Sequence, residues 1–557
     1  MQMTIGQFLL KRLTEIGIEH MFGVPGDYNL QFLEQVKACD GLHFVGNCNE
    51  LNAAYAADGY ARLKGAGALL TTYGVGELSA ICGVAGAAAE HVPVVCITGA
   101  PPLHAMEQRL PLHHTLADGN YDDMMICFRQ FTAAQTRITP ANAVGEIDRV
   151  LTTCLREKKP VYIQLPSDVS YLTVEAPDAP LDLSFASDPH QLEAAVKHAL
   201  RLWSQAKRSA LLIDMDADRL GLRHLMAELV EKAAVPYASL TTGKAILSET
   251  HPLWVGHYLG EGSSVEAKAC VEGSDCLITT APRFIEVNSG HFTQKLPKDH
   301  TIMLACHSVT IGNVRYEGVN AQELLRHLLQ QVPERAGDNH RRLEEEAWSP
   351  QADAPLTQER LWQRMARFIK AGDTVLAESG TSNIGLTSQA LAPDVTYISA
   401  NIWGSIGYTL PATLGTALAA PDRRHLLFIG DGSFQLTAQE LSTLLRLELK
   451  PIIFLLNNRG YTIERYILGM QEAYNDVANW KYAELAGVFS EKGNFLTAHA
   501  RTEGELEAVL EKAAVSNALT FIELHLDPFD APATLKTFGP ATAEFDYGPL
   551  GPQRLSA

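Results

Sequence analysis

The most constraining feature of the sequence is the stretch of residues 426–460, which has the pattern of one strand–helix–strand unit. Residues 426–429 and 452–456 are short apolar runs typical of buried strands. Asp431 lies two residues beyond the end of the first run, and Asn458 lies two residues beyond the end of the second. Parallel strands joined by a helix point the same way, so both polar residues are expected at one edge of a sheet, where open α/β sheets bind ligands.

The segment between the two runs has the pattern of a helix. Thr437 and Glu440 form a capping-box pattern that predicts its start. Leu441, Leu444 and Leu445 recur at helical spacing and predict its buried face. The unit is therefore predicted to be βαβ, with a parallel sheet at its centre.

The polar residues of this unit have the chemistry of a magnesium and phosphate site. A carboxylate (Asp431), an amide oxygen (Asn458) and a backbone carbonyl are hard ligands of the kind that Mg²⁺ prefers. Gly430 and Gly432 would let the backbone approach phosphate oxygens closely. A lone Gly-Asp-Gly is most often only a turn, but here Asn457-Asn458 follows 24 residues later within the same unit.

Apolar runs alternate with helical patterns along the whole chain, which predicts an α/β protein with three doubly wound domains and mostly parallel sheets. Two irregular stretches rich in Pro, Ala and charge, residues 173–191 and 331–356, have the composition of linkers. The predicted domains are residues 1–180, 190–335 and 355–557.

Composition excludes several classes of partner. A net charge of −19 argues against nucleic acid and against anionic lipid as partners, and no run approaches the ~18 apolar residues of a membrane span. The start of the chain lacks the pattern of a signal peptide and fits an amphipathic helix. The nine cysteines form no CxxC pair, and most stand in apolar stretches. We expect reduced core cysteines and a cytoplasmic protein.

Five further ionisable residues stand in segments suited to a site. Glu50 follows an apolar run and begins a helical pattern, Asp27 lies in a turn, and His113 and His114 lie in a loop after a strand pattern. Glu464 lies six residues beyond Asn458. Each also has an ordinary structural interpretation: helix-start acids for Glu50 and Glu464, a helix cap for Asp27, and surface residues for the histidines.

These segments resemble the thiamine diphosphate (ThDP)-dependent enzymes over nearly the whole chain. The 430–460 unit has the form of that family's diphosphate and metal motif, and FGVPGDYN, NELNAAYAADGYAR, TTYGVGELSA and WGSIG are similar to its decarboxylase branch. That branch includes the pyruvate and indolepyruvate decarboxylases. The resemblance implies an N-terminal aminopyrimidine-binding domain, a central domain and a C-terminal diphosphate-binding domain, with ThDP and Mg²⁺ as cofactors.

The resemblance also implies roles for particular residues. The metal ligands would be Asp431, Asn458 and the carbonyl of Gly460, and Ile406 would hold the cofactor in a bent shape while the Gly404 carbonyl accepts from its aminopyrimidine. The cofactor-binding residues implied are Thr72, Thr381, Gly404, Ile406, Gly432, Ser433 and Ile463.

The catalytic residues implied are Glu50, Asp27, His113, His114 and Glu464. Glu50 would bond the aminopyrimidine and promote loss of the thiazolium C2 proton, which gives an ylid that acts as electron sink. Asp27 and the two histidines would serve protonation and product release, and Glu464 would act near the substrate carboxylate. If Asp27 and Glu464 are buried together, they would titrate as a coupled pair.

The implied reaction is non-oxidative decarboxylation of a 2-keto acid to an aldehyde and CO₂ through a ylid and an enamine. Asn383 and Ile384 stand where relatives often carry Ala and an aromatic residue, so we expect a substrate larger than pyruvate, such as a branched-chain or aromatic 2-keto acid. One alternative is a carboligase of the acetolactate synthase type or a pyruvate oxidase. The His113-His114 pair and the lack of a GxGxxG in the middle block argue against it. The other alternative is a non-catalytic ThDP-binding protein.

The two ends of the expected site come from different parts of the chain. Glu50 belongs to the first predicted domain, whereas Asp431 and Asn458 belong to the third. One cofactor must therefore lie across a junction between domains. The resemblance implies that this junction forms between subunits, in a homotetramer built as a dimer of dimers, with each site completed by two chains.

Overall fold

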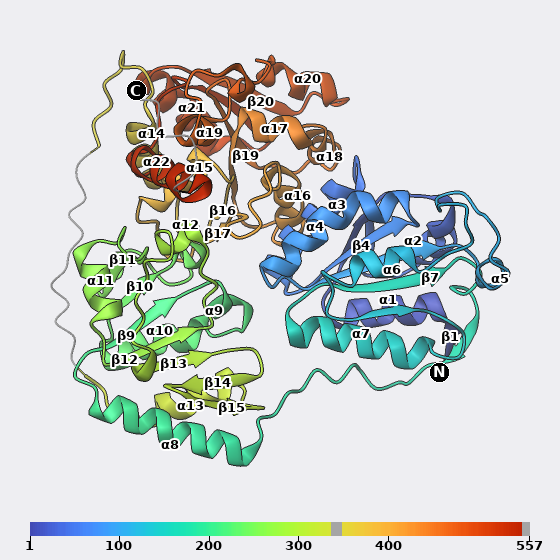
Figure 1. The fold of residues 1–557 in the computed structure, drawn as a ribbon. Helices are drawn as coiled ribbons and strands as arrows, with labels where there is room; N and C mark the ends of the chain where they lie inside the picture. The colour runs from blue at the N-terminus through green and yellow to red at the C-terminus, as the bar shows by residue number, and fades with distance from the viewer. Residues whose placement is uncertain (336–347, 549–557) are drawn as a thin grey trace.

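A computed structural model of the chain describes residues 1–335 and 348–548, and it has three blocks, each built on its own sheet (Figure 1). The predicted α/β class with mostly parallel sheets is confirmed. Part of the predicted linker 331–356, residues 336–347, lies outside the described residues, as do residues 549–557 of the predicted C-terminal domain. The domain boundaries themselves stay predictions.

The first block, elements β1 to β8, contains a six-stranded sheet of order β3-β2-β4-β5-β7-β6 in which every pairing is parallel. Its strands are β2 (His20–Gly23), β3 (His43–Gly46), β4 (Gly67–Thr72), β5 (Val94–Ala100), β6 (Gln135–Arg137) and β7 (Val161–Pro166). Its helices are α1 (Ile5–Glu15), α2 (Leu30–Lys37), α3 (Glu50–Lys64), α4 (Val75–Ala89), α5 (Leu103–Glu107), α6 (Asp123–Phe128) and α7 (Ala143–Glu157).

Helix α3 has clear start and stop signals that place Glu50 at its first residue. The side chain of Asn49 accepts a hydrogen bond from the backbone N–H of Asn52, which caps the helix. Gly65 ends it with φ of 91°, a left-handed conformation that glycine adopts without strain. The start of α3 follows β3 closely, so Glu50 lies near the carboxyl-terminal edge of the sheet.

The central block, elements α8 to α13, has a seven-stranded sheet of order β11-β10-β9-β12-β13-β14-β15, in which β14 and β15 are antiparallel additions at one edge. Its strands are β9 (Ser209–Ile213), β10 (Tyr237–Ser239), β11 (Trp254–His257), β12 (Cys276–Thr280), β13 (Thr301–Leu304), β14 (Ser308–Ile311) and β15 (Val314–Glu317). Its helices are α8 (Pro189–Gln205), α9 (Asp216–Arg219), α10 (Arg223–Ala233), α11 (Val265–Glu272), α12 (Glu286–Ser289) and α13 (Ala321–Gln331).

The third block, elements α14 to α22, has a six-stranded, all-parallel sheet of order β17-β16-β18-β19-β21-β20. Its strands are β16 (Thr374–Ala377), β17 (Thr396–Ile398), β18 (His425–Gly430), β19 (Ile452–Asn457), β20 (Phe495–Ala500) and β21 (Leu519–His525). Its helices are α14 (Gln358–Phe368), α15 (Thr381–Thr387), α16 (Thr409–Ala419), α17 (Asp431–Thr437), α18 (Glu440–Arg446), α19 (Thr462–Ile467), α20 (Leu485–Phe489), α21 (Glu503–Val515) and α22 (Ala533–Tyr547).

The first and third blocks share one hydrophobic core. Leu69 of β4 and Leu427 of β18 belong to the same buried cluster, which is bridged by α3 and α16. These two helices lie side by side, as Figure 1 shows. A Cβ at Gly59 would lie 2.4 Å from the carbonyl oxygen of Ala412, so the crossing depends on a glycine that allows close backbone approach.

The predicted capping box at Thr437 and Glu440 is wrong. Helix α18 has no side-chain cap, and the Thr437 hydroxyl donates instead to the carbonyl of Gly407 at 2.8 Å. Glu440 is fully buried and accepts hydrogen bonds from the side chains of Asn47 and Asn52 of the first block. The local pattern suggested a helix start, but burial at the contact between blocks gives this carboxylate partners from a distant part of the chain.

Two other sequence expectations need correction. The stretch 173–191 is not wholly irregular, because β8 (Thr173–Glu175) pairs antiparallel with β1 (Gln2–Thr4) and α8 begins at Pro189. All nine cysteines are free, as expected, but only three of them are buried (Cys96, Cys154 and Cys276). Within the described ranges, no helix combines the length and the apolar character needed to cross a membrane.

Candidate active site

Asp431 and Asn458 lie next to each other because their strands are neighbours. β18 and β19 pair in parallel, and each residue directly follows the end of its strand, as predicted. Asp431 is the first residue of α17 and is 1% exposed. Its carboxylate accepts hydrogen bonds from the backbone N–H groups of Gly432 at 2.8 Å and Arg459 at 2.6 Å, which orient it at the sheet edge.

Three oxygens converge at this edge. The amide nitrogen of Asn458 donates to the Thr462 hydroxyl at 2.7 Å, which turns the amide oxygen toward Asp431. That oxygen lies 3.1 Å from the carbonyl oxygen of Gly460 and 3.2 Å from Oδ1 of Asp431. Octahedral bonds of about 2.1 Å to Mg²⁺ place neighbouring ligand oxygens about 3.0 Å apart.

The donor set at this edge, a carboxylate, a side-chain amide and a backbone carbonyl, is one that can hold a divalent cation. Without a cation, the opposite orientation of the Asn458 amide would satisfy more hydrogen bonds, because its nitrogen could donate to both facing oxygens. Burial raises the pKa of Asp431 to about 7, although backbone N–H groups, first that of Gly432, oppose the rise. A bound divalent cation would offset the cost of burying this carboxylate.

The loop that carries Asn458 has an unusual backbone conformation. Arg459 has φ of 60°, a left-handed conformation that is uncommon for a residue other than glycine. The turn directs the Arg459 N–H to Asp431 and places the Gly460 carbonyl beside Asn458. The backbone of Arg459 therefore shapes the site.

A cavity of about 100 Å³ opens over these oxygens. It brings together most of the residues predicted from the third block, namely Thr381, Ile406, Asp431, Gly432, Ser433, Asn458, Gly460, Ile463 and Glu464. Gly404 does not line it and is exposed. A Cβ at Gly432 would lie 2.5 Å from the ring of Tyr461, so glycine is required there for close packing.

Sequence reasoning missed Glu378, a buried carboxylate in the lining of this cavity. Burial raises the pKa of Glu378 to about 7, and hydrogen bonds, first from the Thr409 hydroxyl, oppose the rise. Glu378 directly follows β16, the neighbour of β18. The rule that identified Asp431, a polar residue at the end of a buried strand, would also have identified Glu378.

A second group of predicted residues gathers at the edge of the first block's sheet. Asp27 Oδ2 lies 2.9 Å from Nε2 of His113, whose Nδ1 lies 3.1 Å from the Tyr28 hydroxyl. The rings of His113 and His114 have centroids 4.4 Å apart. The side chains of Asp27 and His113 are 50% and 58% exposed, so this group is open to solvent in the single chain.

Glu50 and Thr72 belong to the same edge. A Cβ at Gly76 would lie 3.1 Å from both Glu50 Oε1 and Thr72 Cγ2, which places all three residues together. Glu50 is half-buried, and Thr72 is buried at the end of β4. The Thr72 hydroxyl has no hydrogen-bond partner among the described residues, so a bound group could satisfy it.

Within the part of the chain that the structure describes, the two groups do not line a common cavity. Every residue in the lining of the cavity over Asp431 comes from the third block, and none comes from the edge that carries Asp27, Glu50 and the histidines. Glu464 is also exposed, so it does not form a buried pair with Asp27 within the single chain.

Comparison with known proteins identifies the three blocks. Three domains of the thiamine pyrophosphate enzymes match the chain: the N-terminal TPP binding domain over residues 3–122, the central domain over residues 196–332 and the C-terminal TPP binding domain over residues 379–524. The chain is also similar to curated proteins named alpha-keto-acid decarboxylase.

Two of these relatives cover nearly all of the chain. The Mycobacterium leprae protein is 39% identical over 96% of this chain and 94% of its own length. The Mycobacterium bovis (strain BCG / Pasteur 1173P2) protein is 40% identical over 96% of each. With all three domains present and full-length relatives at this identity, the chain belongs to the thiamine pyrophosphate enzyme family, among the alpha-keto-acid decarboxylases.

Proposed function

We propose that the chain catalyses the non-oxidative decarboxylation of a 2-keto acid to an aldehyde and CO₂. The observation that carries the proposal is the convergence of Asp431, Asn458 and the Gly460 carbonyl in a cavity that also holds Ile406 and Glu464. The names of the full-length relatives support the same reaction.

The metal and diphosphate end of the site would be held by the third block. Asp431, Asn458 and the Gly460 carbonyl would bind Mg²⁺, which normally takes its remaining ligands from phosphate and water. Gly432 and Ser433 line the same cavity and would contact the diphosphate, with Thr381 and Ile463 beside it. Bound ThDP would supply the electron sink for the carbanion left when CO₂ departs.

The first block would supply the groups that move protons. Glu50 would hold a proton at the aminopyrimidine end of the cofactor, near Thr72, while Ile406 and the Gly404 carbonyl of the third block would fix the cofactor's orientation. Asp27, His113 and His114 would protonate the carbon that loses CO₂, because aldehyde release requires a proton at that atom. Glu464 would act at the substrate carboxylate from the opposite side.

We further propose that each site is completed by two chains. Exposed apolar side chains flank both groups: Val75, Leu78 and Leu116 in the first block, and Leu436 and Leu468 in the third. Covering them in a symmetric dimer would bring the edge with Glu50 against the cavity over Asp431 and give two equivalent sites. Assembly of two such dimers into a homotetramer, and a cytoplasmic location, stay predictions from the sequence.

The expected preference for substrates larger than pyruvate rests on sequence resemblance alone. Neither Asn383 nor Ile384 lines the cavity of the single chain. The Asn383 side chain donates to Asn401 at 2.8 Å and accepts from the Tyr397 hydroxyl at 2.7 Å. The substrate test therefore includes pyruvate, branched-chain 2-keto acids, phenylpyruvate and indolepyruvate.

The proposed function is tested by reconstitution. Exhaustive dialysis against EDTA should abolish activity, and ThDP with Mg²⁺ should restore aldehyde and CO₂ production from at least one of these acids. Products should be analysed for carbon–carbon ligation, since acetolactate formation without aldehyde would favour the carboligase instead. Full activity in cofactor-free protein would refute the proposal.

A further inference from the structure

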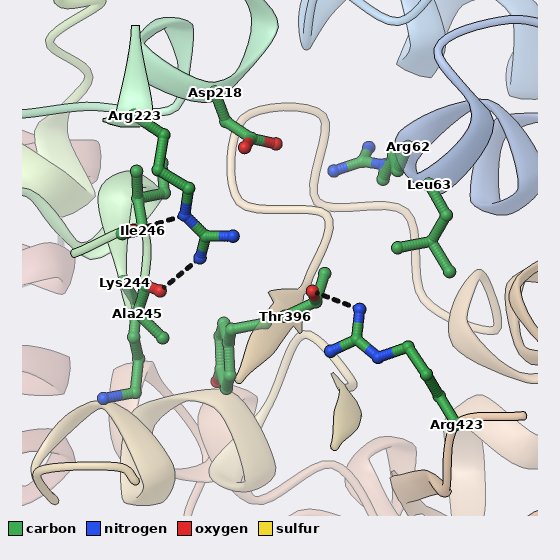
Figure 2. A pocket seen from close by; sticks show the side chains of 10 residues that line it. Arg62, Leu63, Asp218, Arg223, Lys244, Ala245, Ile246, Thr396 and Arg423 are labelled. Atoms are coloured by element: carbon green, nitrogen blue, oxygen red, sulfur yellow. Dashed lines mark hydrogen bonds between the residues drawn. The ribbon is translucent and has the colours of Figure 1, made fainter. Parts of the chain in front are cut away.

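A second cavity, of about 230 Å³, lies where all three blocks meet. Figure 2 shows guanidinium groups directed into it from each block: Arg62 of α3, Arg223 of α10, and Arg423 from the loop between α16 and β18. It shares no lining residue with the cavity over Asp431, so it is separate from the candidate active site.

Among the described residues, two of these arginines donate hydrogen bonds only to neutral partners. Arg223 donates only to the backbone carbonyls of Ala245 and Ile246, the latter at 2.5 Å, as Figure 2 shows. Arg423 donates to the Thr396 hydroxyl at 2.9 Å and to backbone carbonyls, first that of Gly372 at 2.7 Å. Among the residues that the structure describes, neither forms an ion pair.

The other charges around the cavity are already balanced. Arg62 pairs with Asp58 and Glu90, and the buried ammonium of Lys244 pairs with Glu249. Asp218, the one carboxylate in the lining, lies 3.3 Å from Arg219. The surplus charge of the cavity is therefore that of Arg223 and Arg423.

These two guanidinium groups repel each other across the cavity. Burial lowers the pKa of Arg423, and the charge of Arg223 lowers it further, while the carboxylates of Asp373 and Asp394 oppose the change. Holding two like charges together costs free energy, and an anion between them would offset that cost. A guanidinium group offers N–H donors in a planar fork that matches phosphate and carboxylate oxygens.

We propose that this cavity binds a small oxyanion, the phosphate or carboxylate group of a metabolite, and that the bound anion ties the three blocks together. Its volume is below the range of roughly 300–1,000 Å³ of sites for drug-sized ligands, so it suits a small anion better than a dinucleotide. Among the described residues, Nη1 of Arg223 has no acceptor and is available to such a ligand.

The test is anion binding to the holoenzyme. Saturation with ThDP and Mg²⁺ keeps the diphosphate site filled, so added anions report on the second cavity. Inorganic phosphate and succinate would be titrated separately by calorimetry, with ionic strength held constant by KCl. We expect saturable binding near one anion per chain and a rise in Tm with ligand concentration. Whichever of the two anions binds more tightly indicates whether the natural ligand carries a phosphate or a carboxylate group.

Two variants that change the charge of the cavity in opposite directions give the decisive comparison. Arg223→Met should weaken binding by at least about tenfold, because it removes a charged donor. Asp218→Asn should tighten binding, because Asp218 is the only carboxylate that the described residues contribute to the lining. Arg326→Met, an exposed arginine elsewhere in the central block, is the matched control and should bind as the wild type does.

Two results would overturn the proposal. One is the absence of saturable binding or of a Tm rise, for both anions, beyond what KCl produces. The other is equal affinity in the wild type and Asp218→Asn, a comparison that stays informative even if Arg223→Met fails to fold.

Discussion

The two ends of the candidate active site differ in how complete they are within one chain. At the third block, Asp431 is buried, its carboxylate is held by two backbone N–H groups, and three oxygens already face one another. At the first block, the side chains of Asp27 and His113 contact each other, but they are 50% and 58% exposed to solvent, respectively. One end is preformed, whereas the other is open.

This difference follows from chemistry and from chain order. The metal ligands come from one βαβ unit, so local folding alone can place them. Groups that tune proton transfer need a desolvated setting, which shifts pKa values and excludes water. The first block does not supply that setting to Asp27 and His113, so a second surface must cover them.

The largest effect is expected from Asp431→Ala, which removes the anionic oxygen at the preformed end. Mutation of a residue that orients a metal ligand lowers metal affinity or activity roughly 10–100-fold. Removal of the ligand itself should therefore lower them more than about 100-fold. ThDP and Mg²⁺ binding by calorimetry and aldehyde formation measure this. Asp422→Ala, an exposed aspartate before β18, is the control. Normal cofactor binding by Asp431→Ala would remove the basis of the metal site.

Glu50→Gln should affect the open end while it leaves the preformed end intact. An amide cannot hold the proton at the cofactor, so activity should fall by roughly 10²–10⁴-fold. Mg²⁺ and ThDP binding should be largely retained, and exchange of the C2 proton, followed by NMR, should slow. Glu34→Gln, an exposed acid on α2, serves as the control. An unchanged exchange rate would mean that Glu50 has no part in removing the C2 proton and only begins helix α3.

A smaller effect is expected from pH. In the metal-free chain, burial raises the pKa of Asp431 to about 7, so below pH 7 the carboxyl is protonated and Mg²⁺ must displace a proton. One pH unit below that pKa, apparent Mg²⁺ affinity should be about tenfold weaker than at pH 8. Calorimetry at pH 6 and pH 8 tests this, after subtraction of Mg²⁺ binding to free ThDP. Equal affinities at the two pH values would mean that Mg²⁺ displaces no proton from a buried carboxyl group when it binds.

The smallest effect on activity is expected from Glu440→Ala, at the contact between blocks within one chain. Its loss leaves Asn47 and Asn52 without their buried acceptor, which should lower the free energy of unfolding by about 2–4 kcal/mol. Activity per folded chain at low temperature should change little. Tm and denaturant unfolding provide the measurement, with the exposed Glu448→Ala as control. A loss of activity without a loss of stability would place Glu440 in the catalytic machinery.

Local patterns predicted the strands and the positions of Asp431 and Asn458 at the sheet edge well, for a physical reason. Buried strands such as β18 and β19 are continuous apolar runs, and a polar residue directly after such a run must lie at the sheet edge. The positions of Asp431 and Asn458 therefore follow from adjacent sequence. Glu378 obeys the same rule, because it directly follows the buried strand β16.

Features that depend on distant contacts could not be predicted in this way. The Thr437 and Glu440 pattern was interpreted as a cap, because nothing local indicates that Asn47 and Asn52 of another block would bind Glu440. The cavity with Arg223 and Arg423 is also invisible in sequence, because its lining comes from three separate blocks. The predicted substrate preference depends on Asn383 and Ile384, and neither residue lines the cavity over Asp431.

Subunit complementation tests whether the open end of one chain is covered by the preformed end of another. Glu50→Gln and Asp431→Ala chains, each inactive alone, would be mixed under conditions in which subunit exchange is shown independently with tagged chains. A mixed dimer would have one site with both lesions and one with neither. Recovery of aldehyde formation toward about half of the wild-type activity per mixed dimer is the expected result. If the chains exchange and no activity returns, each chain builds its own site and two chains do not share one.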